Sequence, residues 1–132
     1  MGADGGTGQR FVVRVGAGTS DEVVVLGLGG ELDHDTVAPL RRALEDCARA
    51  RRVVVDCSDL AFCDSTGLNE LLRARVRLRE TGGTLDLAGL RPPVSRMFEI
   101  TGARTVFRVY EDAAEALADE QAGPRDTGEA HG

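Results

Sequence analysis

The stretch VVVDCSDLAFCDSTGLNELL, residues 53–72, holds the most informative change of pattern in this chain. Its valines, Val53 to Val55, form an apolar run typical of a short buried strand, which we expect to end at Asp56. Leucines then recur at helical spacing from Leu68 to Leu78. The stretch therefore predicts a strand, a loop and an amphipathic helix, with Asp64-Ser65-Thr66-Gly67 at the junction between loop and helix.

Upstream of this stretch, two β-rich runs precede one helical segment. The runs Phe11–Val15 and Val23–Leu28 are separated by a turn-like stretch, so they predict an antiparallel hairpin. We expect Gly29-Gly30 to end the second run. Asp35 offers an N-cap for a helix that should continue to about Ala50, because apolar residues follow it at helical spacing.

Downstream, helical and extended patterns continue to alternate. Gly82-Gly83 should close the second helix, since a left-handed residue commonly ends a helix. A strand is expected over residues 84–87, followed by a third helix that stops near Gly102. Residues 106–110 predict the last strand, and residues 113–117 a closing helix.

The order of these segments defines the expected fold. Strands that alternate with helices of about a dozen residues predict an α/β domain with a mainly parallel sheet. We expect a single domain over residues 10–121, with about five strands, an antiparallel hairpin at the N-terminal edge and about four flanking helices. The Gly-rich residues 1–9 and the polar residues 122–132 are expected to be disordered tails.

Composition excludes several classes of function. The formal net charge of −6 argues against binding nucleic acid or an anionic membrane surface. The three cysteines form no C-x-x-C pair, and the two histidines show no ligand spacing, so neither a metal site nor a cofactor is expected. The sequence shows no signal peptide and no apolar run that could span a bilayer. These features together predict a cytoplasmic protein.

Three segments resemble the STAS domain family, in the order and spacing of that family. Gly30-Glu31-Leu32-Asp33 is similar to the segment between its second strand and first helix. Phe62-Cys63-Asp64-Ser65-Thr66-Gly67-Leu68 looks like its signature loop, and Val94, Met97-Phe98 and Thr101-Gly102 resemble its third-helix segment. Free-standing chains of this length resemble the anti-sigma factor antagonists of that family.

The resemblance implies a regulatory binding protein and not an enzyme. Such antagonists bind a cognate anti-sigma factor, commonly a serine-protein kinase, and so release the sigma factor for transcription. The kinase phosphorylates the serine that follows the aspartate of the loop, which is Ser65 after Asp64 here, and a serine phosphatase is a further expected partner. We expect a monomer or weak dimer. The residues expected to bind the partner are Asp33, Asp64, Ser65, Thr66, Gly67, Leu68 and Asn69.

One position departs from the family pattern. Asn69 lies where many relatives have a second glycine, and it should face the partner and tune which partner is accepted.

Other interpretations of the same residues stay open at this point. Ser65 and Thr66 are also suitable helix caps. A serine hydrolase would need a base, for which only His34 and His131 are available. Cys63 could be a redox-active thiol or a small buried side chain. The arginines from Arg73 to Arg79 are expected to form a solvated face, with partner contact through Arg73 or Arg77 as the alternative. The alternative function is a STAS scaffold or ligand-sensing subunit that is not phosphorylated.

Overall fold

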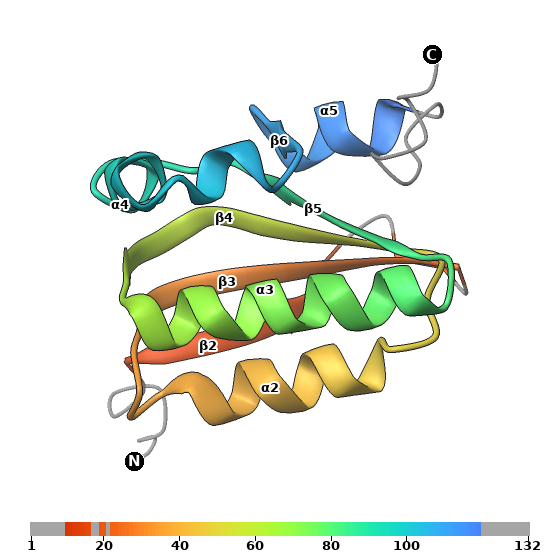
Figure 1. Ribbon diagram of the computed structural model, residues 1–132, viewed down its shortest axis with the longest axis horizontal. Helices are drawn as coiled ribbons and strands as arrows, with labels where there is room; N and C mark the ends of the chain where they lie inside the picture. The colour runs from red at the N-terminus through yellow and green to blue at the C-terminus, as the bar shows by residue number, and fades with distance from the viewer. Residues whose placement is uncertain (1–9, 17–18, 21, 120–132) are drawn as a thin grey trace.

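A mixed five-stranded sheet forms the centre of the computed structural model, which describes residues 10–16, 19–20 and 22–119. The first two strands are antiparallel and all the others are parallel, which confirms the predicted mixed sheet with an N-terminal hairpin. The strands follow one another across the sheet in chain order (Figure 1). They are β2 (Phe11–Val15), β3 (Val23–Leu32), β4 (Arg52–Cys63), β5 (Thr84–Ala88) and β6 (Val109–Tyr110).

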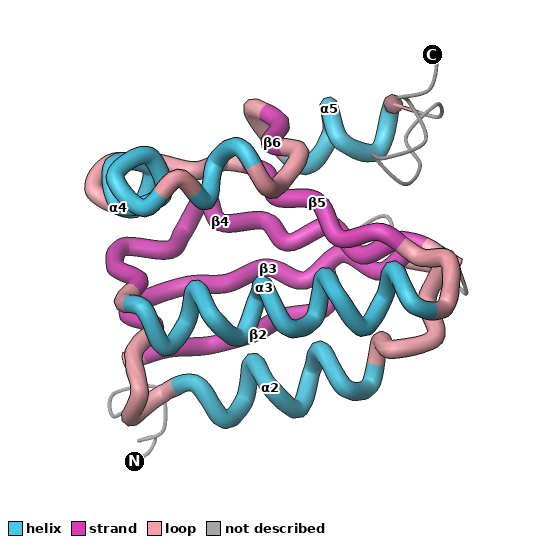
Figure 2. The backbone as a smooth tube through the Cα atoms, viewed as in Figure 1, coloured by secondary structure: helices cyan, strands magenta, loops and turns pink. Residues whose placement is uncertain are grey.

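Within the described residues, four α-helices flank this sheet, as the sequence predicted. They are α2 (Val37–Asp46), α3 (Ser65–Glu80), α4 (Val94–Thr101) and α5 (Ala113–Ala118). Helices α2 and α3 lie side by side along the sheet, whereas α4 and α5 lie toward its β5–β6 end (Figures 1 and 2). None of the helices in the described ranges combines the length and apolar character that a membrane span requires.

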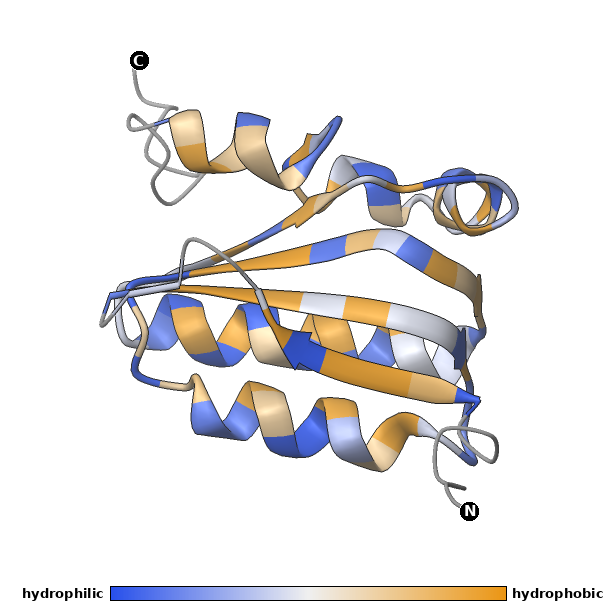
Figure 3. Ribbon diagram, turned by 180° about the vertical axis from the view of Figure 1, so that it is seen from behind, coloured by the Kyte–Doolittle hydropathy of each residue, from blue (hydrophilic) through white to orange (hydrophobic). Residues whose placement is uncertain are grey.

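Alternation along β4 divides the buried side chains between the two faces of the sheet. Val53 and Val55 join the larger cluster, which receives leucines from α2 and α3. Val54 joins a smaller cluster beneath α5. All three valines are fully buried, so this part of β4 is apolar on both faces of the sheet, as the sequence predicted. Hydrophobic positions dominate the strands and alternate with hydrophilic ones on the helices (Figure 3).

The strands β3 and β4 are longer than the sequence indicated. The predicted end of β3 at Gly29-Gly30 is wrong, and so is the predicted end of β4 at Asp56. The two strands stay paired as far as Leu32 in β3 and Cys63 in β4. Register shifts near Gly29 and Gly30 allow the two strands to stay paired. Gly30 has a φ of +95°, and a Cβ atom there would overlap the carbonyl of Arg10, so glycine is required within the strand and not after it.

Three smaller predictions are also corrected. The N-cap position of α2 is Thr36 and not Asp35, and the helix ends at Asp46, short of Ala50. The last strand contains only Val109 and Tyr110, because the N–H groups of Val106 and Phe107 bond the Ala103 carbonyl in a turn that continues the 3-10 helix Ala103–Thr105. The predicted left-handed Gly82 after α3 is confirmed, with a φ of +86°. The predicted disordered tails, residues 1–9 and 122–132, lie outside the described residues.

Candidate functional site

The junction that the sequence singled out lies where β3 and β4 end together. Leu32 and Cys63 are paired in the sheet, and the Asp64 N–H donates to the Leu32 carbonyl over 3.0 Å. Asp33 and Asp64 therefore leave neighbouring strands at the same edge, which is the carboxyl edge where functional groups of parallel sheets commonly gather. Strand pairing thus brings Asp33 and the Asp64-Ser65-Thr66-Gly67 loop to one edge of the sheet.

Asp64 is the N-cap of α3. One of its carboxylate oxygens accepts hydrogen bonds from the N–H groups of Thr66, at 2.9 Å, and Gly67, at 3.1 Å. The interpretation of Ser65 or Thr66 as the cap is therefore wrong. Ser65 is instead the first residue of the helix, and its side chain is exposed.

The cap predicts a measurable contribution to stability. Asp64→Ala should lower the free energy of unfolding by about 1 kcal/mol, because two N–H groups at the start of α3 lose their acceptor. Asp64→Asn is the matched control, since asparagine caps helices about as well as aspartate. Urea denaturation followed by circular dichroism measures both variants. Equal losses for Ala and Asn would contradict the assigned role of the cap.

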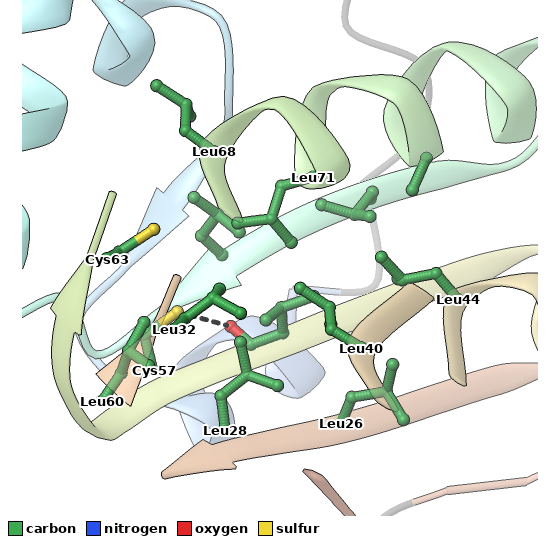
Figure 4. Packing of buried hydrophobic residues seen from close by; sticks show 14 of the residues in the cluster. Leu26, Leu28, Leu32, Leu40, Leu44, Cys57, Leu60, Cys63, Leu68 and Leu71 are labelled. Atoms are coloured by element: carbon green, nitrogen blue, oxygen red, sulfur yellow. Dashed lines mark hydrogen bonds between the residues drawn. The ribbon is translucent and has the colours of Figure 1, made fainter. Parts of the chain in front are cut away.

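Gly67 and Leu68 are buried and support the loop from below. A Cβ atom on Gly67 would lie 2.6 Å from the Leu32 side chain and 3.0 Å from the Cys63 sulfur. Leu68 packs in the same cluster as Leu71, Leu32 and Cys63 (Figure 4). The start of α3 is thus fixed against the ends of β3 and β4, which holds Ser65 at the surface.

Asp33 is held in one orientation by its neighbours. Its carboxylate accepts from one Arg10 nitrogen, at 3.1 Å to each oxygen, and from the N–H groups of Asp35 and Thr36. Partial burial of Asp33 favours a raised pKa, but the hydrogen bonds and the Arg10 charge outweigh it, so the pKa of this carboxyl is lowered. The site therefore presents a fixed carboxylate, paired with the Arg10 guanidinium, at the same sheet edge as the Ser65 loop.

Cys63 is a buried side chain and not a reactive thiol. It is 4% exposed, and burial, with the nearby Asp64 charge, raises its pKa to about 12. A thiol that ionises so weakly is a poor nucleophile at neutral pH. The geometry favours the interpretation of Cys63 as a small core residue.

An exposed stripe along α3 begins at Ser65. Asn69, Arg73 and Val76 follow it at helical spacing and are all exposed, Val76 at 53%. A shallow groove of about 350 Å³ lies on this stripe, lined by Leu72, Arg73, Val76 and Arg77. From the sequence, these arginines were expected to form a solvated face. The helical spacing of the residues from Ser65 to Val76 is the sequence signal that could have revealed the stripe.

A further buried polar contact near the stripe was not predicted. Glu70 is only 3% exposed although it lies in a helix rich in charged residues, and it accepts a hydrogen bond from Arg41 of α2 over 3.1 Å. Nothing in its sequence context distinguishes it from a surface glutamate. This ion pair fixes α3 relative to α2 and so contributes to placing the stripe.

The groups needed for other chemistry are not assembled around Ser65 in the described part of the chain. His34 is exposed and lies 3.2 Å from Asp35, and His131 is outside the described residues. Residues 10–16, 19–20 and 22–119 contain no group of His, Cys, Asp and Glu side chains that could hold a metal ion. What the geometry offers is an exposed hydroxyl, fixed charges and an elongated helix surface.

Comparison with known protein families identifies the family to which this arrangement belongs. The family model described as "Mlab, STAS domain" matches residues 15–109, which includes the whole β3-to-α4 region and the Ser65 loop. The chain belongs to the STAS domain family. The resemblance inferred from the three sequence segments is thereby confirmed.

Relatives within this STAS family are anti-sigma factor antagonists. The anti-sigma-B factor antagonist of Staphylococcus aureus is 30% identical over 95 residues, covering 70% of this chain and 88% of the relative. The anti-sigma F factor antagonist of Paenibacillus polymyxa is 28% identical over 100 residues, covering 74% of this chain and 86% of the relative. Antagonism of this kind is a regulatory and not a catalytic role.

The fold of this STAS domain is shared by a solved anti-sigma factor antagonist. The structure of SpoIIAA in its unphosphorylated form superposes with a TM-score of 0.72 at 24% identity, covering 83% of this chain and 96% of that one. The phosphorylated form of SpoIIAA from Bacillus superposes with a TM-score of 0.65. The four-helix, five-stranded architecture is therefore the STAS fold.

Proposed function

We propose that this STAS domain binds a cognate anti-sigma factor, which is itself a serine-protein kinase, and is released from it by phosphorylation of Ser65. Binding of the anti-sigma factor frees the sigma factor for transcription, and a serine phosphatase restores the binding-competent form. The observation that carries the proposal is the placement of Ser65, exposed at the first position of α3 and directly beside the capping Asp64. The existence of a phosphorylated form of the related SpoIIAA supports it.

The exposed stripe on α3 supplies a docking surface for that partner. Ser65 and Asn69 lie at one end of the stripe, and the groove between Leu72 and Arg77 lies further along it. A partner that combines apolar and acidic side chains fits this groove, because Val76 is apolar and both flanking arginines are cationic. The stripe explains how a kinase could hold the helix while its active site reaches Ser65.

The local charges explain why a phosphate would oppose binding. Asp64 already satisfies the N–H groups of Thr66 and Gly67, so a phosphate on Ser65 would lie beside the Asp64 carboxylate and near Asp33. Phosphorylation adds about −1.5 to −2 charges. The modified loop would therefore carry a concentrated, hydrated negative charge that a packed interface has to desolvate.

The proposal is tested by incubating the chain with serine kinases of the anti-sigma type and ATP, followed by mass spectrometry. We expect a single phosphate that maps to Ser65. Ser65→Ala should remain unmodified, and Ser95→Ala, which changes a serine on α4, should be modified like the wild type. An unmodified wild type, or a phosphate that persists in Ser65→Ala, would contradict the assignment and favour a non-phosphorylated scaffold.

A further inference from the structure

The outer edge of β2 carries backbone groups that point away from the sheet. In the described part of the sheet β2 pairs with β3 alone. Glu31 donates to the Arg10 carbonyl and Gly16 donates to the Val25 carbonyl, each over 2.7 Å. Since the hydrogen-bonded positions of an antiparallel pair alternate, the N–H and C=O groups of residues 11, 13 and 15 face outward.

A groove runs beside this edge, between β2 and α2. It has a volume of about 570 Å³ and is lined by all five residues of β2, of which only Arg14 is polar, by Leu26 of β3, and by Pro39, Arg42, Ala43 and Asp46 of α2. Val15, at the end of the strand, is 70% exposed. An unpaired strand edge next to an apolar groove is a surface that accepts another strand.

We propose that a second copy of this chain occupies the β2 edge, forming a two-fold symmetric dimer with one sheet continuous across both copies. In this arrangement β2 runs antiparallel to the second copy's β2, with Val13 opposite the second copy's Val13. Phe11 then faces the second copy's Val15, and the outward N–H and C=O groups of both strands pair. The register uses the full length of the strand and places apolar side chains against one another.

The charges on α2 are complementary under the same symmetry. Helix α2 follows β3, which is antiparallel to β2, so α2 runs in the direction of β2 and lies beside it. A two-fold axis at Val13 makes the two copies of α2 antiparallel. Arg42 and Asp46 are exposed, line the groove and lie about one turn apart, so Arg42 of each copy faces Asp46 of the other.

The composition of the chain's own ends favours a second copy over either terminus as the occupant. Residues 120–132, EQAGPRDTGEAHG, contain no valine, leucine, isoleucine or phenylalanine to fill the groove. Residues 1–9, MGADGGTGQ, likewise contain none of these. The β2 strand itself carries phenylalanine and valine at alternate positions, which suits the groove of a second copy.

Sedimentation velocity over about 5–500 μM full-length protein tests the dimer, a range suited to a contact of moderate area. We expect the wild type to sediment increasingly as a dimer with rising concentration. Val15→Arg should abolish the dimer, because it places a charge against the second copy's Phe11. Asp46→Arg should weaken the dimer by about tenfold, because Arg42 then meets an arginine.

A charge reversal separates the proposed contact from a general loss of structure. The double variant Arg42→Glu/Asp46→Arg restores opposite charges across the axis and should return the dimerisation constant to within about threefold of the wild type. Val76→Asp, on the α3 stripe, is the control and should leave dimerisation unchanged. Thermal melts confirm that each variant is folded.

Three results would overturn the proposal. The first is a wild type that stays monomeric over the whole concentration range. The second is a dimer that survives both Val15→Arg and Asp46→Arg in folded protein, which would place the contact elsewhere. The third is a double variant no stronger than Asp46→Arg alone, which would refute the two-fold pairing of α2. None of these results depends on whether Ser65 is phosphorylated.

Discussion

Arg52→Ala should lower the free energy of unfolding by about 3–5 kcal/mol, because it leaves a buried carboxylate without its main partner. Arg52 is 7% exposed and Asp86 is 2% exposed. Two nitrogens of Arg52 donate to one Asp86 oxygen, at 2.9 and 3.1 Å, and a third donates to the Ala116 carbonyl at 2.8 Å. Burial already raises the pKa of Asp86, because it disfavours the charged carboxylate. Loss of the neighbouring positive charge would add to this cost of burying the carboxylate.

The consequence should be concentrated at the C-terminal end of the domain. Arg52 also lies over the Tyr110 ring, with its guanidinium carbon 5.7 Å from the ring centroid, and its bond to the Ala116 carbonyl joins α5 to the sheet. Arg108 lies 3.9 Å from the same Asp86 oxygen and still offsets part of the buried negative charge in the variant. We therefore expect Arg52→Ala to fold with a lower free energy of unfolding. Urea denaturation gives the free energy, and hydrogen exchange should show the largest loss of protection in β5 and α5.

Arg51→Ala is the matched control for this prediction. Arg51 bonds Glu22 over 3.0 Å, but both side chains are largely exposed, at 64% and 69%. An exposed ion pair contributes at most about 1 kcal/mol, so the control should be close to the wild type. Similar losses from the two neighbouring arginines would contradict a stabilising role for the buried pair.

The second large effect concerns affinity for the anti-sigma factor and rests on the proposed function. Ser65→Glu should weaken binding by at least about 100-fold, or about 2.8 kcal/mol. The new carboxylate would lie beside the Asp64 carboxylate, and the interface would have to desolvate both negative charges. Isothermal titration calorimetry with the purified cognate partner measures the change.

Ser65→Gln separates charge from size in the same experiment. Glutamine has nearly the shape of glutamate, so we expect it to bind within about fivefold of the wild type. Protein phosphorylated on Ser65 should bind at least as weakly as Ser65→Glu, because a phosphate carries more charge than a carboxylate. Equal affinities for the Glu, Gln and phosphorylated forms would show that the charge at this position does not control binding.

The order of strands and helices could be predicted from the sequence because hydrophobic periodicity reports it directly. The ends of β3 and β4 could not, since their pairing past Gly30 and Asp56 depends on register shifts between two strands distant in the chain. The brief β6 is a similar case, because the 3-10 turn before it is set by packing of the Ala103–Phe107 region.

The candidate site was predicted in outline and corrected in detail. The sequence identified Ser65, Asp64 and Asp33, and strand pairing brings them to one edge. It did not reveal that Asp64 is the cap, because serine and threonine at the same junction are equally good candidates by residue type. Asp86 lies in the strand expected over residues 84–87, and nothing in that segment indicates that the aspartate would be buried in an ion pair with Arg52.

The capping role of Asp64 has a consequence for how this position can evolve. Because the aspartate supplies the acceptor that starts α3, the N–H groups of Thr66 and Gly67 are satisfied without the side chain of residue 65. A substitution at position 65 leaves this cap in place, so a lineage could gain, lose or exchange the proposed phosphoacceptor while the start of the helix persists. In the proposed switch, regulation and architecture occupy adjacent residues, so natural selection can act on one without disturbing the other.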